Sequence, residues 1–208
     1  MRFRVRPQDL AEVTNAYENR LFGPDFEATP DQIAHWLRSP MFFWAVAIDD
    51  RGPPDVGSVL GTLSILVTTV HSFEQLVRGH IRENDLQPWY AASSDIPIAY
   101  FCSYTLRKAG AGAYLFKLAG NYLSALKTEH DIELGGVFSI GATPAGARHL
   151  CRSGIDRSAG TYAGRYPILE GRHDSALSNF WQKLLRRPAP VRKRSIPTEG
   201  RLEGLQAA

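Results

Sequence analysis

The sequence predicts a single α/β domain in which strands and helices alternate along the chain. Short apolar runs and amphipathic segments follow one another in the order β-α-α-β-β-β-α-β-α-β. The chain has 208 residues, of which 44% are hydrophobic and 22% charged. This length suits one well-buried core, and this composition is that of an ordinary globular protein.

The first half of the chain is expected to hold three strands and three helices. Residues 10–21 repeat apolar side chains at helical spacing. Thr29 and Pro30 supply an N-cap and a proline at the first helical position, and Ser72 begins a second capping box. The expected strands are residues 3–5, 41–48 and 58–67, and the expected helices are residues 10–21, 30–37 and 72–84.

The second half is expected to continue with a strand, a glycine-rich turn and the longest amphipathic helix. Apolar residues recur at helical spacing from Gly112 to Leu126, and Gly154 is suited to close a shorter helix. The expected strands are residues 98–104, 137–140 and 162–169, and the expected helices are residues 112–126, 145–152 and 174–187.

Charge is unevenly distributed between the domain and the C-terminal tail. The formal net charge is +3, yet residues from Lys183 onward hold seven basic and two acidic side chains, which leaves 17 basic and 19 acidic residues before them. The domain therefore lacks the basic excess of a nucleic-acid binder. We expect a domain over residues 1–187, with an inserted helical segment at about 68–97, and a disordered basic tail over residues 188–208.

Cysteine content and hydropathy indicate a cytoplasmic protein. Cys102 and Cys151 are too few for a disulfide-stapled scaffold, which favours a reducing compartment. The N-terminal residues have no apolar signal region, and no segment has the roughly 18 apolar residues of a membrane helix. No association with a membrane or nucleic acid is expected, and the oligomeric state stays open, a homodimer included.

The segment Arg107-Lys108-Ala109-Gly110-Ala111-Gly112 places glycines where a strand turns into a helix. Backbone amides at a helix start point outward, and glycine lets a pyrophosphate approach them closely. The helix dipole favours the anion further. The alternative is a glycine-containing turn that binds no ligand, because a lone R-x-x-G-x-G is a weak pattern.

With these residues the chain resembles the GNAT superfamily of acyl-CoA-dependent N-acyltransferases over roughly residues 1–169. The resemblance implies a mixed, mostly antiparallel twisted sheet with helices on both faces and a splay between the fourth and fifth strands. It implies that acetyl-CoA or another acyl-CoA is the co-substrate, with no metal. The residues implied to hold it are the end of the fourth strand (Tyr100, Phe101, Cys102) and the cradle (Arg107, Lys108, Ala109, Gly110, Ala111, Gly112, Ala113).

The catalytic residues usual in this family are replaced here. Cys151 aligns with a tyrosine that protonates the departing thiolate, and Ser139 stands where some members have a glutamate base. A thiol with a pKa near 8.5 is a candidate proton donor, with packing as the alternative role. Asp95 and His71 are the candidate bases, with turn chemistry and loop exposure as their alternatives. His149 is expected to be solvated.

The inserted segment is expected to form one wall of the acceptor pocket, through Trp89 and Tyr90. The alternative is simple edge packing. Histidine and cysteine spacings match no metal motif. The predicted function is acetyl transfer from acetyl-CoA to an amine by direct attack in a ternary complex. A non-catalytic CoA-binding module and a synthase using a longer acyl donor are the alternatives.

Overall fold

A computed structural model describes residues 7–22, 26, 29–49, 55–108 and 110–172. The predicted first strand, the terminal helix at 174–187 and the tail at 188–208 lie outside the described residues. The elements are α1 (Pro7–Phe22), α2 (Pro30–Trp36), β1 (Phe42–Ile48), β2 (Val59–Thr69), α3 (Val70–Val77), the 3₁₀ turn η2 (Glu83–Asp85), β3 (Pro97–Leu106), α4 (Ala111–His130), β4 (Gly136–Ile140), α5 (Pro144–Arg152), β5 (Arg157–Tyr162) and β6 (Tyr166–Arg172).

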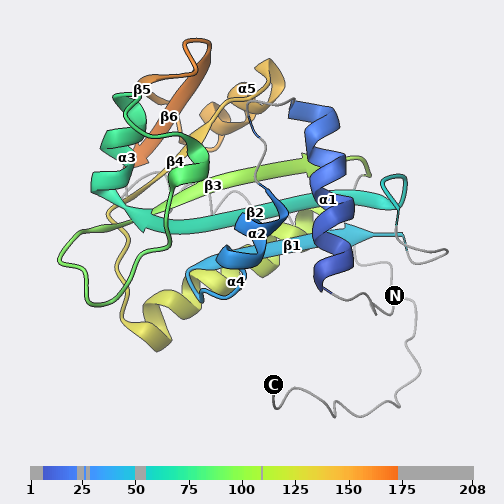
Figure 1. Cartoon of the computed structure of the whole chain (residues 1–208), viewed down its shortest axis with the longest axis horizontal. Coiled ribbons are helices and arrows are strands. Elements are labelled where there is room, and N and C mark those ends of the chain that lie inside the picture. The colour runs from blue at the N-terminus through green and yellow to red at the C-terminus, as the bar shows by residue number, and fades with distance from the viewer. Residues whose placement is uncertain (1–6, 23–25, 27–28, 50–54, 109, 173–208) are drawn as a thin grey trace.

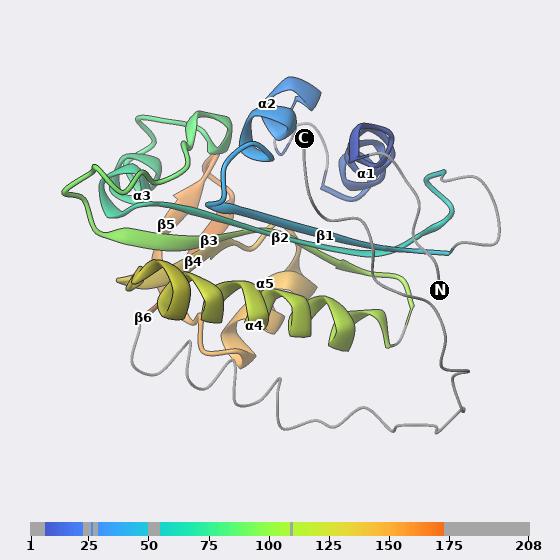
Figure 2. The same ribbon diagram turned by 90° about the horizontal axis from the view of Figure 1, so that it is seen from below.

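One six-stranded sheet in the order β1-β2-β3-β4-β6-β5 divides the molecule into two layers of helices (Figure 1). The edge-on view shows α1, α2 and α3 on one face, and α4 and α5 on the other (Figure 2). Only the β3–β4 pair is parallel; the other four pairs of neighbouring strands are antiparallel. The predicted mixed, mostly antiparallel sheet with helices on both faces is therefore confirmed.

The parallel pair at the centre of the sheet is short, and the strands then separate. β3 and β4 are partners only from Ala99 to Phe101, although β3 continues to Leu106. On the other side of β3, Ser64 faces Ser103 and Ile65 faces Phe101, so Cys102 is the extra residue of a bulge. The splay expected between the fourth and fifth strands thus opens here, where a bulge bends β3.

Both faces of the sheet are covered, so the central strands are buried on both sides. β2 is almost continuously buried from Val59 to Thr68, as expected for a strand between two layers of helices. Leu63 and Leu115 belong to the core cluster beneath α4, whereas Leu66 and Phe73 belong to the cluster beneath α2 and α3. The cores on the two faces hold the helices against the sheet.

Two predicted elements differ in the structure. The helix expected over residues 72–84 is α3, which begins two residues earlier, at Val70, because Thr69 and not Ser72 accepts the capping hydrogen bond. It ends before Gly79, whose φ of +73° is left-handed. The single strand expected at 162–169 is the hairpin β5–β6, because Ala163 and Gly164 both have positive φ at the turn.

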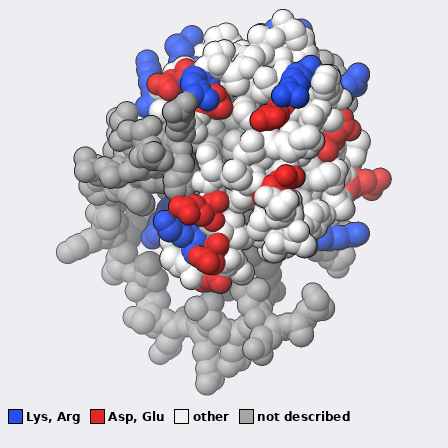
Figure 3. Space-filling model, turned by 90° about the vertical axis from the view of Figure 1, so that its left-hand side faces the viewer, with Lys and Arg blue, Asp and Glu red and all other residues white. Residues whose placement is uncertain are grey.

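The surface and the helices carry two further observations. On the face seen in Figure 3, over α3 and the β5–β6 hairpin, the described acidic and basic side chains are interspersed rather than gathered into a field of one sign. Among the described helices, none is both long enough and apolar enough to cross a membrane.

Candidate active site

A cavity passes through the splay between β3 and β4 and reaches both layers of helices. On one side it is lined from α1, α2 and η2, and on the other from α4 and α5. Phe101 and Cys102 on β3 and Ser139 on β4 stand between the two sides. The separation of the two strands therefore provides one continuous space with a different wall on each face of the sheet.

The junction between β3 and α4 places the first backbone amides of a helix at the end of the unpaired part of β3. Gly110 is the N-cap of α4, with a left-handed φ of +96°. The amides of Arg107 and Lys108 donate to Leu60 O (2.8 and 3.3 Å), and Ala111 N donates to Lys108 O (3.3 Å). The following amides, at Gly112 and Ala113, fall in the first helical turn, where no partner exists within the helix. Ala109 lies outside the described residues.

Gly112 lies in close contact with side chains from the end of β3 at the same junction. A Cβ on Gly112 would lie 2.8 Å from Leu106 Cδ1 and 3.2 Å from the Tyr104 hydroxyl. A Cβ on Gly110 would meet no atom within 4 Å. The two glycines of the pattern therefore have different roles. Gly112 allows α4 to lie close to the end of β3, and Gly110 turns the chain and leaves space at the start of α4.

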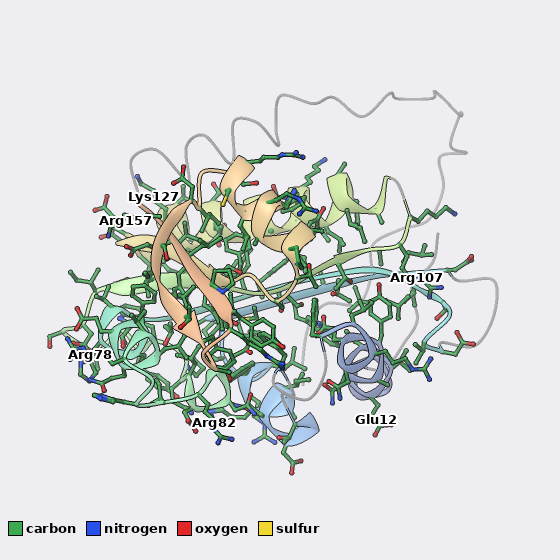
Figure 4. The ribbon with its side chains drawn as sticks, turned by 90° about the horizontal axis from the view of Figure 1, so that it is seen from above. Glu12, Arg78, Arg82, Arg107, Lys127 and Arg157 are labelled. Atoms are coloured by element: carbon green, nitrogen blue, oxygen red, sulfur yellow. The ribbon has the colours of Figure 1, made fainter. Side chains whose placement is uncertain are left out.

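Arg107 does not extend toward this space. Its guanidinium donates to the carbonyls of Val56 and Gly57, both at 3.2 Å, and lies 6.0 Å from the ring centroid of Tyr17. Figure 4 places Arg107 at the end of the sheet near α1. In the described structure the arginine ties the β1–β2 connection to α1 and the start of the junction, so its side chain does not face the cavity.

The three residues predicted at the strand end have different surroundings. Tyr100 and Phe101 pair with β4, and Phe101 O also accepts a hydrogen bond from Ser139 Oγ at 2.9 Å. Cys102 is the first residue past the paired stretch. The free edge of β3 therefore begins at Cys102 and continues toward Leu106. Burial raises the pKa of the Cys102 thiol well above its ordinary value, which keeps it protonated at neutral pH.

Glu83 is a functional candidate that the sequence did not reveal. It is 8% exposed and lines the cavity from η2. Its Oε1 accepts a 2.6 Å hydrogen bond from the Tyr100 hydroxyl, and its buried Oε2 has no partner among the described residues. Burial raises the pKa of Glu83 to about 7; the bond from Tyr100 opposes this rise, and the charge of Glu18 adds to it.

Glu18 brings a second carboxylate to the same side of the cavity. Its Oε1 accepts a hydrogen bond from Thr62 Oγ1 at 2.7 Å. Burial raises the pKa of Glu18, and hydrogen bonds from Thr62 and Ser103 oppose the rise. One turn before it on α1, Thr14 is 2% exposed, lines the cavity and has a buried hydroxyl with no partner. Two acids and a free hydroxyl thus face the α1–α2 side.

His149 is not solvated as expected from the sequence. It is half-buried on α5, its ring stacks on Tyr104 at 5.1 Å between centroids, and its buried Nε2 has no partner in the part of the chain that the structure describes. Burial, followed by the charge of Arg152, lowers its pKa. Helical spacing alone did not reveal that Tyr104 and Phe116 would cover this face of α5. His149 is therefore a neutral imidazole on the α4–α5 side of the cavity.

The other predicted site residues lie outside the cavity. Cys151 is exposed on α5, His71 is exposed on α3, and Asp95 is exposed in the loop before β3. In the same loop, Trp89 donates its Nε1–H to Asp95 O at 2.9 Å, and Tyr90 is 59% exposed. The inserted segment does reach the cavity, but the residue it contributes is Glu83.

Little in the sequence could have pointed to Glu83. It lies in the polar run Arg82-Glu83-Asn84-Asp85, which resembles a solvated turn. Its burial arises because Tyr100 from β3 and Tyr162 from β5 close over it, and the Tyr162 hydroxyl accepts from Glu83 N at 3.4 Å. Within the described residues, no group of three or more metal-ligating side chains occurs.

The strand order, the splay beside a glycine junction and the two layers of helices form the GNAT-type fold that the sequence resemblance implies. No family model and no curated protein matches the chain. Two solved structures of Arabidopsis thaliana NAA60 are similar to it. One, in complex with a bisubstrate analogue, shares 15% identity at a TM-score of 0.49, and covers 82% of this chain and 95% of that chain. The other, in complex with acetyl-CoA, shares 14% identity at a TM-score of 0.47, covering 81% and 95%.

Proposed function

We propose that the protein is an acyl-CoA-dependent N-acyltransferase that transfers an acetyl group to an amine within a ternary complex. The observation that carries the proposal is the splay of β3 from β4, followed at the end of β3 by the first-turn amides of α4. A thioester held in the splay would have its diphosphate at the amides and its acyl end at the cavity. The donor and the acceptor would then enter from opposite faces of the sheet.

The residues present fit the donor. The amides of Gly112 and Ala113 and the dipole of α4 suit a pyrophosphate. The free edge of β3 from Cys102 onward offers backbone groups that an extended pantetheine amide chain pairs with, as an added strand would. Phe116 and Leu150 give this side of the cavity an apolar wall. Tyr100 to Cys102 and the cradle at 107–113 remain the proposed donor-binding residues.

The chemistry requires an acceptor nitrogen that has lost its proton. The nitrogen bonds to the acyl carbonyl carbon as the carbon–sulfur bond breaks. An ammonium acceptor first gives one proton to a base, and the second proton lost on amide formation goes to the departing thiolate. Glu83 is the proposed base, because a carboxylate with a pKa of about 7 is matched to proton transfer at neutral pH. Cys151, which lies outside the cavity, is the alternative proton donor, and Asp95 and His71 are the alternative bases.

The donor site is tested by titrating CoA into the protein in a calorimeter. Gly110→Glu should weaken binding by at least about tenfold, or 1.4 kcal/mol, because a carboxylate side chain enters the anion's space. Gly164→Glu is the matched control, since Gly164 also has positive φ (+69°) and free space around a Cβ but lies in the β5–β6 turn. Equal CoA affinity in both folded variants would contradict the cradle.

Release of free thiol tests for catalysis. Acetyl-CoA incubated with the protein and candidate amines should yield thiol and amide in equal amounts. CoA binding without thiol release from acetyl-CoA or longer acyl donors would instead support a non-catalytic CoA-binding module. Thiol release only with a longer donor would identify the protein as a synthase of longer-chain amides.

A further inference from the structure

We propose that the acceptor is a small primary monoamine with an apolar, aromatic or similarly flat body, bound between α1 and α2 with its ammonium group against Glu83. The inference rests on the proposed acyl transfer and specifies its acceptor. Glu83, Glu18 and Thr14 form the polar end of this site, and the aromatic residues of α1, α2 and β1 form its apolar end.

Two buried atoms that have no hydrogen-bond partner among the described residues define the polar end. Glu83 Oε2 and Thr14 Oγ1 are each buried, and both residues line the cavity. Buried polar atoms are nearly always satisfied, so two in one cavity indicate a missing ligand. A carboxylate oxygen only accepts hydrogen bonds and a hydroxyl can accept one, so the complementary group is a multiple donor. A protonated primary amine has three donors on one atom.

The charged side chains that line the cavity also favour an ammonium ligand. Among the described residues lining the cavity, the carboxyl groups are those of Glu18 and Glu83, and no lysine or arginine is present. Arg82, the neighbour of Glu83, is exposed and points away from the molecule (Figure 4). A buried carboxylate without a cationic partner is costly, and an ammonium ligand would relieve that cost.

The apolar end restricts the rest of the ligand. The cavity is lined there by Phe22, Phe26, Trp36, Phe42 and Trp44. The indole N–H of Trp36 already donates to Leu86 O at 3.2 Å, so its ring offers only an apolar face. A second ammonium group or a peptide backbone placed here would lose its hydrogen bonds to water without replacement. An aromatic or aliphatic body has no hydrogen bonds to water to lose, and the faces of the lining aromatic rings also attract the ammonium group.

Trp36 and Trp44 make binding observable without any acyl donor. Titration of the protein with 2-phenylethylamine should change tryptophan fluorescence in a saturable way. The neutral analogue 2-phenylethanol should bind at least about tenfold more weakly, because it cannot pair with Glu83. Spermidine and a tetrapeptide with a free N-terminus should produce no saturable change. Binding of spermidine or the peptide in preference to 2-phenylethylamine would overturn the proposed acceptor class.

Glu83→Gln should remove the preference for the amine over the alcohol while leaving 2-phenylethanol binding unchanged, which also shows that the variant is folded. Thr14→Val, which preserves shape and deletes the free hydroxyl, should weaken amine binding about threefold. Glu74→Gln is the matched control, since Glu74 pairs with Arg78 on the exposed side of α3. An unchanged preference in both Glu83→Gln and Thr14→Val would overturn the assignment of the polar end.

The same samples separate this inference from the function it rests on. Amine-selective fluorescence changes with no thiol release from any acyl-CoA would contradict acyl transfer and leave the amine site standing. Thiol release with peptides or polyamines, without release or fluorescence change with 2-phenylethylamine, would support acyl transfer and overturn the acceptor class.

Discussion

The two sides of the cavity are built by different means. On the α4–α5 side, the features that suit a donor are consecutive in the chain, since Gly110 and Gly112 and the amides between them form one turn. On the α1–α2 side, the polar groups come from Thr14, Glu18 and Glu83, which only the folded chain brings together. A glycine turn that opens a helix can thus be recognised in a sequence, whereas a cluster of side chains from separate elements cannot.

The sharpest test of this contrast is Glu83→Gln, which should affect acceptor chemistry and spare donor binding. We expect kcat/KM for the amine to fall about a hundredfold or more, the usual contribution of a positioned base, with CoA affinity unchanged. The groups facing Glu83 are Tyr100, Cys102, Tyr162 and Glu18. Glu18→Gln removes the like charge and should move the acidic limb of the pH–rate profile, near pH 7, to lower pH.

If Glu83→Gln lowered CoA affinity as much as it lowers kcat/KM for the amine, donor and acceptor would not bind on separate sides of the cavity. The pH–rate profile supplies the second check. If the acidic limb persists in Glu83→Gln at its parental position, another group is the base, and Asp95 and His71 become the next variants to measure.

Glu83 should also give the protein a distinctive dependence of stability on pH. Its folded pKa is raised from 4.5 to about 7, so the folded state favours the neutral acid. This contribution is complete below pH 4.5 and is lost as pH rises through 7, which lowers the free energy of unfolding by about 3 kcal/mol. Urea denaturation at pH 5 and pH 8 measures most of it, and in Glu83→Gln the difference between the two pH values should shrink by most of that amount.

A smaller effect is expected from His149 on the donor side. His149→Phe keeps the stacking on Tyr104 and deletes the unpartnered Nε2, so KM for acetyl-CoA should rise about three- to tenfold with little change in amine affinity. His130→Phe, at the exposed end of α4, is the control. A change in amine affinity with no change in KM for acetyl-CoA would contradict the assignment of His149 to the donor side of the cavity.

The smallest effect is expected from Cys151. Because its side chain is exposed and outside the cavity lining, Cys151→Ala should change turnover less than about threefold. A loss near a hundredfold, with CoA affinity retained, would instead assign the thiol the role of proton donor to the leaving group.

The sequence by itself determined the features that depend on neighbours in the chain. Apolar periodicity predicted α4, and Thr29 with Pro30 predicted the start of α2, where Thr29 does accept the capping bond from Gln32 N. The glycines after Arg107 predicted the turn into α4, because left-handed backbone at Gly110 is a local requirement. Fold class followed from the order of such elements.

Tertiary structure decided everything that depends on residues far apart in the chain. The three-residue pairing of β3 with β4 opens the splay, and no local pattern shows where two strands stop pairing. Packing of Tyr100 and Tyr162 over Glu83 turned an acid in a polar loop into a buried carboxylate with a raised pKa. Burial and electrostatic coupling depend on which side chains meet, and that is a property of the folded chain alone.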